Sequence, residues 1–455
     1  MKRFSFLLLL VIIMQPACSQ KPAHKKVIAE KSKVAGGIPV TGIVSNLSDS
    51  ALLDLVQRQT FRYFWDFAHP VSAMSRERSN EAYNYGDETV TIGGTGFGVM
   101  SVIVAVERKW IPRDTAARFL LKMINFLSRA DSYHGVFPHF MNGETGKTIP
   151  FSRKDDGADL VETSYLFEGL LCARQYFNAN NETERDLRNR IGWMWNEVEW
   201  NWFTKGGEEV LYWHWSPNNG WSMNFPIRGY NECLITYVLA ASGERYPVSD
   251  EVYHRGWAQS NFFKNGKTFY GYLLPLGFDY GGPLFFSHYS FLGLDPRGLK
   301  DRYADYWQQN LNHTLINHAY CIDNPKKFKG YGENCWGLTA SDTYNGYNAH
   351  SPDNDWGTIT PSAALSAFPY TPEFSMKALR HFYYDLGDKI WSEYGFVDAF
   401  NETKNWYAKS HLAIDQGPII VMIENYRSGL MWKLLMSCPE IRAGLKKLGF
   451  ESPHF

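Results

Sequence analysis

Four acidic residues lie within eight positions of this chain, and acids at such spacing can carry out proton-transfer chemistry. They are Asp155, Asp156, Asp159 and Glu162, and an apolar run at residues 165–171 follows them. If the run is a helix, Asp155, Asp159 and Glu162 share one side of its opening turns. Repulsion between them can raise the pKa of a carboxyl toward that of a working proton donor. Acids also stabilise helix N-termini, but that explains one or two of them rather than four.

Two further acids stand at the start of apolar segments. Glu232 lies between Tyr230 and Cys233, so burial without a partner would raise its pKa by desolvation. Asp415 precedes the aliphatic run 419–422 in the same way. For both acids, capping of a helix N-terminus is the alternative interpretation.

Helical hairpins are the elements that would bring these acids together. Short joints follow every second predicted helix, whereas six long segments rich in Gly, Trp, Tyr and Asn precede the other helices. Long loops are uncommon unless they are functional, so this alternation predicts an all-α (α/α)6 toroid with long loops and small β-hairpins on one face. An irregular α-solenoid is the alternative, but no fixed-period repeat is present. The predicted helices cover residues near 50–67, 94–109, 112–130, 159–177, 182–201, 229–241, 247–256, 283–292, 300–319, 358–368, 372–386, 413–426 and 428–436.

The toroid predicts that the starts of six inner helices converge on one mouth. These starts lie near residues 94, 159, 229, 283, 358 and 413. The expected mouth therefore contains the acids named above together with His288, Asp342 and Gln416.

The charge and the aromatic content of the chain indicate which kind of molecule it binds. The 46 basic and 47 acidic residues leave a net charge of −1, and no basic run indicates a nucleic-acid partner. Aromatic residues make up 16% of the chain, and many lie in polar, Gly-rich segments such as residues 212–221. Flat rings beside hydrogen-bonding groups suit sugars, which have an apolar face and a hydroxyl rim. Aromatic side chains that fix long loops are the alternative.

The N-terminus has the pattern of an export signal. A basic start, an apolar run at residues 4–14 and small residues before Cys18 predict a lipoprotein-type signal peptide over residues 1–18, with Cys18 as the lipidated residue. Gln15 departs from the aliphatic residue usual at that place. Residues 19–45 are expected to form a flexible tether and residues 46–455 a single catalytic domain. The expected location is the periplasm of a Gram-negative-type bacterium, free or anchored by lipid.

Other motifs do not indicate a nucleotide or metal site. The glycine-rich stretch 93–98 lacks the strand and the Lys of a nucleotide loop, so close helix packing explains it better. No Cys/His cluster has zinc spacing, and no metal or cofactor is expected. Cys172 and Cys233 are predicted to be buried thiols, and Cys321 and Cys335 could pair, although sequence alone does not decide it.

Several longer motifs are similar to those of the bacterial glucoamylase-like family of glycoside hydrolases, whose characterised members are β-1,2-glucanases. The similarity extends over about residues 50–440. It implies an (α/α)6 fold and inverting hydrolysis of β-1,2-linked glucan. It also implies essential acids at Asp155, Asp159, Glu162 and Glu232, with Asp415 as another cleft carboxylate. The matching motifs are residues 155–168, 229–232, 336–342, 395–400, 414–418 and 423–429.

The resulting hypothesis is a monomeric glycoside hydrolase of oligo- or polysaccharides. Glu232 would protonate the glycosidic oxygen, and Asp159 or Asp415 would activate water from the opposite face of the ring. Endo and exo cleavage remain open. Residues expected to stack on glucose rings are Trp213, Trp221, Trp336 and Tyr230, and those expected to hold hydroxyls are Arg228 and Gln416.

Two other functions remain as alternatives. A polysaccharide lyase on the same fold would need a Tyr or His base and a basic groove, which the acid-rich mouth disfavours. A non-catalytic glycan-binding lipoprotein would keep the aromatic residues but would not need the acids.

Overall fold

The computed structural model describes residues 39–80 and 86–455. The predicted signal peptide 1–18, with Cys18, and residues 19–38 of the predicted tether lie outside these residues. The described end of the tether is bonded to the helical body, because Thr41 N donates to Gln59 Oε1 at 3.0 Å and Val44 N to Tyr383 OH at 2.8 Å. Within the described residues, no helix combines the length and apolar character needed to cross a bilayer.

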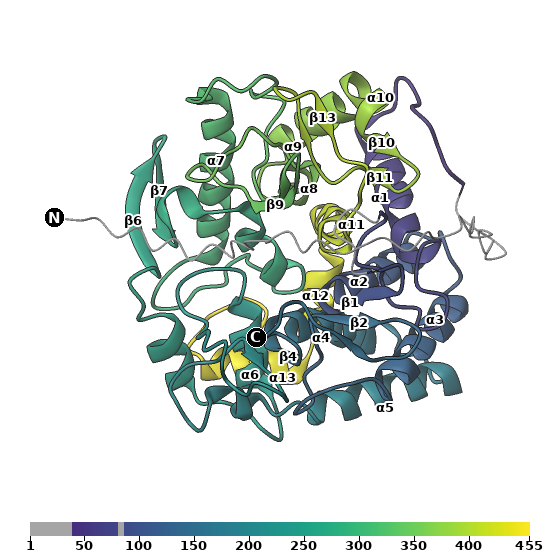
Figure 1. Cartoon of the computed structure of the whole chain (residues 1–455), viewed down its shortest axis with the longest axis vertical. Helices are drawn as coiled ribbons and strands as arrows, with labels where there is room; N and C mark the ends of the chain where they lie inside the picture. The colour runs from purple at the N-terminus through teal and green to yellow at the C-terminus, as the bar shows by residue number, and fades with distance from the viewer. Residues whose placement is uncertain (1–38, 81–85) are drawn as a thin grey trace, which may run out of the picture.

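The described chain forms six inner helical segments that alternate with outer ones (Figure 1). The inner segments are α2 (Ile92–Glu107), α4 (Leu160–Tyr176), α6 (Leu234–Ser242), the 3-10 turns η4 (Leu284–Ser287) and η5 (Tyr289–Phe291), α8 (Pro361–Ser366) and α11 (Ala413–Ser428). α2 contacts α4, α4 contacts α6 and α6 contacts η5, while α8 contacts α11 and α11 contacts α2. The outer segments are α1 (Asp49–Trp65), α3 (Arg113–Leu127), α5 (Glu182–Asn196), the π-helical η2 (Val252–Trp257), α7 (Tyr306–Asp323) and α9 (Pro372–Arg380).

Residue type explains which helices are inside. Every residue of α2 except the last is buried, and its sequence is apolar all round, as expected of a helix surrounded by others. The outer helix α5 buries only one stripe of its surface. Further helical segments complete the body: η1 (Trp200–Thr204), η3 (Asp279–Gly281), the π-helical η6 (His381–Asp385), α10 (Gly387–Ile390), α12 (Leu430–Met436) and α13 (Pro439–Lys447).

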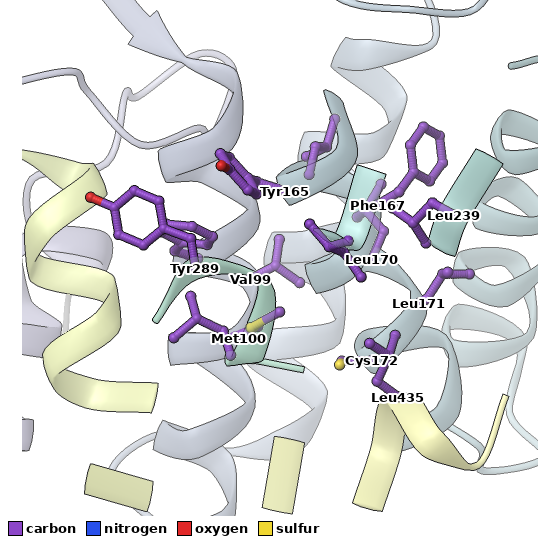
Figure 2. Close-up of a cluster of buried hydrophobic side chains, with 14 of the residues drawn as sticks. Val99, Met100, Tyr165, Phe167, Leu170, Leu171, Cys172, Leu239, Tyr289 and Leu435 are labelled. Atoms are coloured by element: carbon purple, nitrogen blue, oxygen red, sulfur yellow. The ribbon is translucent and has the colours of Figure 1, made fainter. Parts of the chain in front are cut away.

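Glycines allow α2 and α4 to cross in close contact. A Cβ on Gly96 would lie 2.1 Å from Tyr165 O, and one on Gly169 would lie 2.2 Å from Gly96 O. The prediction of close helix packing at residues 93–98 is confirmed. Figure 2 shows the buried cluster beside this crossing, where Val99 of α2 packs near Leu170 of α4.

The long loops carry short antiparallel strands that join neighbouring loops. β1 of the first long loop pairs with β2 of the second, and β4 at the end of the second pairs with β5 of the third. An isolated bridge between Arg78 and Leu412 joins the first loop to the last. The strands are β1 (Thr89–Thr91), β2 (Phe140–Asn142), β3 (Thr148–Ile149), β4 (Ala158–Asp159), β5 (His214–Trp215), β6 (Lys264–Phe269), β7 (Tyr272–Leu276), β8 (Ala340–Thr343), β9 (Gly346–Ala349), β10 (Trp391–Ser392), β11 (Gly395–Phe396), β12 (Phe400–Asn401) and β13 (Trp406–Tyr407).

The structure corrects several predicted elements. The helix expected at 229–241 begins at Leu234, because residues 229–233 form a turn with Gly229 at φ +83°. The helix expected at 283–292 consists of two 3-10 turns. Residues 211–216 pair antiparallel with residues 220–227, through bridges Tyr212–Pro226 and Ser216–Gly220, so a small hairpin is present here, and its first strand also pairs, as β5, with β4. Cys321 and Cys335 are both buried free thiols.

Candidate active site

The N-terminus of α4 positions the first acid group, which we define as Asp155, Asp159, Glu162 and Glu232. Asp159 is the N-cap of α4: its Oδ1 accepts the N–H groups of Val161 at 3.0 Å and Glu162 at 2.9 Å. The sequence predicted that Asp155 lies in the opening turns of the helix, but it lies in the turn before β4. Loop pairing therefore brings Asp155 to the cluster, not a shared helix face.

Two histidines lie among these acids. His139 Nδ1 is 2.9 Å from Asp159 Oδ2, and His214 Nδ1 is 3.3 Å from Asp155 Oδ2. Burial opposes the charged form of His139, but the charges of Glu162 and Asp159 prevail and raise its pKa to about 9. Burial likewise acts to raise the pKa of Asp159, but the hydrogen bond from His139 and the charge of His214 hold it below its usual value. Asp159 is therefore an anion already supplied with donors.

Glu162 reaches from α4 to the start of α2. Its Oε2 accepts the N–H of Gly93 at 2.8 Å, and α2 has no acid of its own in its first turn. A Cβ on Gly93 would lie 2.6 Å from that oxygen, so glycine permits the contact. Burial raises the pKa of Glu162, although the charge of His139 opposes it. Glu162 thus stabilises a helix N-terminus and places a carboxyl in the acid group.

Glu232 is half-buried in the turn before α6. Glu232 does not cap α6, because the N-cap is Cys233 and no side chain bonds to the free N–H groups of that helix; Asn231 Oδ1 instead accepts the N–H of Cys233 at 3.0 Å within the turn. Burial raises the pKa of Glu232 to about 7, and the charges of Glu162 and Asp159 act in the same direction. Glu232 is therefore a partly accessible carboxyl that keeps its proton near neutral pH.

Asp342, Asp398 and Asp415 form the second acid group. Arg78 Nη1 lies 3.0 Å from Asp342 Oδ2, Asp398 Oδ2 accepts the N–H of Asp342 at 2.7 Å, and Ser362 donates to Asp415 Oδ1 at 3.2 Å. Burial raises the pKa of Asp415 to about 7. Burial and the charges of Asp415 and Asp342 raise the pKa of Asp398 well above its usual range.

A pair of tyrosines links the two acid groups. The rings of Tyr165 and Tyr289 are 5.7 Å apart, and both lie at one end of the cluster in Figure 2. The pKa of Tyr165 is raised by burial and by the charge of Glu232, whereas that of Tyr289 is raised by burial and by the charge of Asp415. The charge of Glu162 raises the pKa of both tyrosines, so the pair lies within electrostatic range of the first acid group, and Tyr289 is also within range of the second.

Three of the predicted substrate contacts are buried in this structure. Trp336 is completely buried in a core cluster, and Tyr230 is buried with its hydroxyl bonded to Asn310, so neither ring offers a face to a sugar. His288 is buried beside Tyr370, and burial lowers its pKa to about 3. The sequence placed these residues at helix starts but did not reveal which way their side chains face.

The other predicted contacts lie in different environments. Trp213 and Trp221 are half-buried, Arg228 is exposed and donates to Gly256 O at 3.0 Å, and Gln416 is buried with its Nε2 bonded to Phe396 O at 3.0 Å. The carboxylate of Asp342 accepts hydrogen bonds from Arg78 and from the hydroxyl of Ser410.

A row of aromatic rings leads from the tyrosine pair to the surface. We call it the aromatic row: Tyr289, Phe285, Phe286, Phe278 and Phe262, with successive centroids 5.0, 4.8, 6.4 and 5.5 Å apart. Exposure increases along it from 6% at Tyr289 to 37% at Phe278 and 48% at Phe262. Phe262 also lies close to Gly229, three residues before Glu232. The row is therefore continuous with the acid groups.

Asp155, Asp159 and His214 are the group with the composition of a metal site among the described residues. Each offers one ligand atom, and these atoms lie within 4.8 Å of one another. Two carboxylates and an imidazole suit a divalent cation such as Zn²⁺. However, both oxygens of Asp159 already accept hydrogen bonds, one of them from His139. Asp159 is therefore already supplied with donors, whereas His214 Nδ1 is buried and has no hydrogen bond among the described residues.

Sequence reasoning missed His139, His214, Asp398 and Arg78. A single histidine or arginine in a loop has no spacing pattern, so nothing local marked the first two or Arg78. Asp398 could have been found, because it lies in the motif at residues 395–400.

Comparisons with known proteins agree with this geometry. The family description "Putative glucoamylase" matches residues 224–439. A crystal structure from Bacteroides uniformis with that same description is 62% identical, covers 90% of this chain and 100% of its own, and has a TM-score of 0.89. The endo-β-1,2-glucanase from Chitinophaga pinensis, solved with sophorotriose and glucose, is 56% identical with the same coverage and a TM-score of 0.88.

A curated relative is longer than this chain. The exo β-1,2-glucooligosaccharide sophorohydrolase (non-reducing end) of Parabacteroides distasonis is 44% identical over 423 residues, which are 88% of this chain and 58% of that protein. The fold alone extends to the glucoamylase of Saccharomycopsis fibuligera, at 12% identity, 86% coverage of this chain, 99% of that chain and a TM-score of 0.51. Helical pairs in a ring are therefore common to both near and distant relatives.

Proposed function

Because this chain belongs to the glucoamylase-like family that carries the description "Putative glucoamylase", we propose that it is a glycoside hydrolase that cleaves β-1,2-linked glucan or its oligosaccharides with inversion. The observation that carries the proposal is the presence of two carboxyls with pKa values near neutrality beside the tyrosine pair. The pKa of Glu232 and that of Asp415 are each raised to about 7 by burial, and their charges act on Tyr165 and Tyr289, whose rings are 5.7 Å apart.

The proposed mechanism assigns one proton transfer to each of these two acids. Glu232 donates its proton to the glycosidic oxygen as the bond to the anomeric carbon breaks. Asp415 takes a proton from a water molecule, whose oxygen bonds to the same carbon from the opposite face. An inverting site needs a carboxyl separation of ~6.5–9.5 Å to hold that water.

The structure favours Asp415 over Asp159 as the base. The pKa of Asp159 is held low by donors on both its oxygens, so it has little tendency to accept a further proton. The pKa of Asp415 is raised to about 7 by burial, and its Oδ2 accepts no bond from an N–H or O–H of the described residues. A base near neutral pKa with a free oxygen matches the role.

The aromatic row supports binding of a chain rather than of a single sugar. Its outer rings, Phe278 and Phe262, are exposed and connect through Phe286 to the tyrosine pair. Rings of this kind pack against the apolar faces of glucose units. We assign this row the contacts that the sequence had given to Trp336 and Tyr230.

The test is incubation of purified protein with glucans of defined linkage. Release of reducing ends from β-1,2-glucan, with starch, cellulose and laminarin left intact, is the expected result. Greater activity on starch than on β-1,2-glucan would contradict the proposal. An unsaturated, ultraviolet-absorbing product would indicate a lyase, and binding without release of reducing ends would indicate a glycan-binding protein.

Two further measurements refine the activity on the same samples. Proton NMR during the reaction should show the α-anomer as the first product, because inversion of a β-linkage gives an α-configured hemiacetal. Sizing of early products separates endo cleavage, which gives a range of lengths, from exo cleavage, which gives one short sugar.

We also propose that the protein is exported and lipidated at Cys18. The support is the basic start, the apolar run at residues 4–14 and the small residues before Cys18. Metabolic labelling with a radioactive fatty acid should mark the wild type and not Cys18→Ala, which should move to the soluble fraction. A wild type that carries no lipid and is cleaved elsewhere would contradict this proposal.

A further inference from the structure

The β8–β9 hairpin is connected to the second acid group through the first and last long loops. Asp342 of β8 accepts a hydrogen bond from Arg78 Nη1 at 3.0 Å, and its N–H donates to Asp398 Oδ2 at 2.7 Å. Arg78 forms a β-bridge with Leu412, whose carbonyl accepts the N–H of Asp415 at 3.1 Å. These bonds fix the position of the hairpin relative to Asp415.

A second connection runs through the start of α8. The hydroxyl of Thr360, the N-cap of α8, donates to Ser341 Oγ of β8 at 2.7 Å. Ser362, two residues further along the chain, donates to Asp415 Oδ1 at 3.2 Å. Because Ser341 directly precedes Asp342, one helix start positions both the hairpin and the proposed base.

The register of the hairpin places Tyr347 on the same face as Asp342. The two residues are partners in the antiparallel ladder, and the side chains of such partners project from one face with Cβ atoms about 4.5–5.5 Å apart. Asp342 is 4% exposed, whereas Tyr347 is 45% exposed. The tyrosine ring therefore extends past the buried carboxyl into solvent, on the face of the hairpin that is turned toward the second acid group.

The ring of Tyr347 is open to a ligand. No other aromatic ring and no cation of the described residues lies on it. Tyr344, at the tip of the same hairpin, differs in this respect, because Lys404 Nζ lies 5.3 Å from its ring centroid. Desolvation and the charge of Asp415 raise the pKa of Tyr347, so its phenol stays neutral. An open, neutral aromatic face beside hydrogen-bonding carboxyls suits the apolar face and hydroxyl rim of a sugar.

We propose that Tyr347 forms one wall of the subsite for the glucose unit that is hydrolysed, with its ring packed against the apolar face of that unit. This inference rests on the proposed function. The water activated by Asp415 attacks the anomeric carbon of this unit, so the unit lies about one water molecule away from Asp415. Tyr347 stands beside the same acid group and is therefore within reach of it.

The proposed contact differs from the one assigned to the aromatic row. Every productive complex contains the glucose unit that is hydrolysed, whatever the length of the chain. A contact with that unit therefore acts on short and long substrates alike, whereas Phe278 acts through units further along a long chain.

Tyr347→Ala and Tyr347→Phe test the contact. Loss of the ring in Tyr347→Ala should lower kcat/KM by about two- to tenfold, the effect of one aromatic contact. The factor should be the same for the shortest cleaved oligosaccharide and for long β-1,2-glucan. Tyr347→Phe keeps the ring and should retain most of the wild-type kcat/KM. The melting temperature should not change in either variant, because the side chain is largely exposed.

Tyr344→Ala is the matched control. Tyr344 belongs to the same hairpin and is 42% exposed, but it is not the ladder partner of Asp342. Its loss should leave kcat/KM unchanged on short and long substrates.

Several outcomes would overturn the inference. A loss in Tyr347→Ala that is confined to long glucan would place the ring at a distant glucose unit. An equal loss in Tyr347→Ala and Tyr347→Phe would show that the hydroxyl acts rather than the ring. Unchanged kcat/KM in Tyr347→Ala, or an equal loss in Tyr344→Ala, would show that Tyr347 makes no specific contact.

Binding to an inactive variant separates this inference from the proposed function. In calorimetric titration with a β-1,2-linked glucose oligosaccharide, Glu232→Gln should bind about two- to tenfold more tightly than the variant that combines Glu232→Gln with Tyr347→Ala. Equal affinities would contradict the inference even though the wild type cleaves glucan. If the wild type cleaves no β-1,2-glucan and Glu232→Gln binds none, the proposed function is rejected, and the inference falls with it.

Discussion

Burial raises the pKa of Glu232 to about 7, which is the range that a catalytic proton donor needs. Glu232→Gln keeps shape and hydrogen bonding but cannot donate a proton, and removal of a general acid typically lowers kcat by ~10²–10⁴-fold. We expect that loss with no fall in melting temperature, because Asn231 rather than Glu232 accepts the N–H of Cys233. Turnover and thermal unfolding measured on one sample check this.

The same variant should be stabilised in a pH-dependent way. The pKa of Glu232 is raised from 4.5 to about 7 in the folded state. The folded state therefore binds an extra proton, and its stability falls as pH rises from the unfolded pKa through the folded one. Because Gln carries no such penalty, Glu232→Gln should gain about 1–3 kcal/mol at alkaline pH and little at acidic pH. Near-wild-type turnover with no gain in stability would move the acid role to the cluster at Asp155, Asp159 and Glu162.

His139 should stabilise the fold in the opposite pH range. Its pKa is raised to about 9 by the acids around it, from 6.5 unfolded. A raised histidine pKa contributes stability that is complete below the unfolded pKa and is lost as pH rises through the folded one. His139→Gln should therefore cost about 1–3 kcal/mol below pH 6.5 and much less above the folded pKa. Chemical unfolding at the two pH values tests it, and an equal loss at both would mean that His139 acts by packing.

Residue spacing identified the acids but not what neutralises them. Asp155, Asp159 and Glu162 are close in sequence, so their grouping could be read directly. His139 and His214 come to the same place through strand pairing, which links positions far apart in the chain. No local pattern encodes such a contact, and the ionisation states could be understood only with the structure.

Among the elements, the crossing of α2 and α4 determines the geometry of the first acid group. Gly96→Ala would put a Cβ 2.1 Å from Tyr165 O, so the helices must separate. We expect a loss of about 1–3 kcal/mol from overpacking. Turnover should fall as well, because Tyr165 and Glu162 belong to the helix that moves. Thermal unfolding and activity measured together check both effects.

Gly192 offers a matched control for the crossing. It lies in the outer helix α5, and a Cβ there would meet nothing within 4 Å. Gly192→Ala should stabilise the protein by about 0.5–1 kcal/mol through helix propensity and leave turnover unchanged. If Gly96→Ala behaved like Gly192→Ala, close packing would not be what the glycines of α2 provide.

Regular helices could be predicted, whereas irregular inner segments could not. The helices predicted at 159–177 and 372–386 begin within one residue of the observed starts of α4 and α9. The segments at 229–233 and 283–292 have helical apolar patterns, yet they form a turn and two 3-10 turns. Tertiary contacts determine the backbone conformation of these segments; for example, the hydroxyl of Ser290 donates to the carbonyl of Glu232.

For the whole molecule, the alternation of short and long connections was sufficient to predict the ring. Once six inner starts face one mouth, residues near 159, 232 and 415 must approach each other despite their distance in sequence (Figure 1). The alternation does not say which aromatic rings face that mouth. Trp336 and Tyr230 turned out to belong to the core, whereas the exposed rings lie on the loop between β7 and η4 and near Gly229.

The aromatic row predicts how the enzyme depends on the length of its substrate. Phe278 is 37% exposed and is the fourth ring of the row, counted from Tyr289, so only a chain of several glucose units can contact both it and the acids. An aromatic contact contributes about 0.5–1.5 kcal/mol, which corresponds to about a two- to tenfold change in kcat/KM. Phe278→Ala should therefore lower kcat/KM by that factor on long β-1,2-glucan and leave the shortest cleaved oligosaccharide unaffected. Trp193→Ala on the outer helix α5, where the side chain is 54% exposed, is the control and should change neither value. An equal loss on long and short substrates would show that Phe278 acts on the acids themselves, and no loss on either would show that the glucan leaves the site by another path.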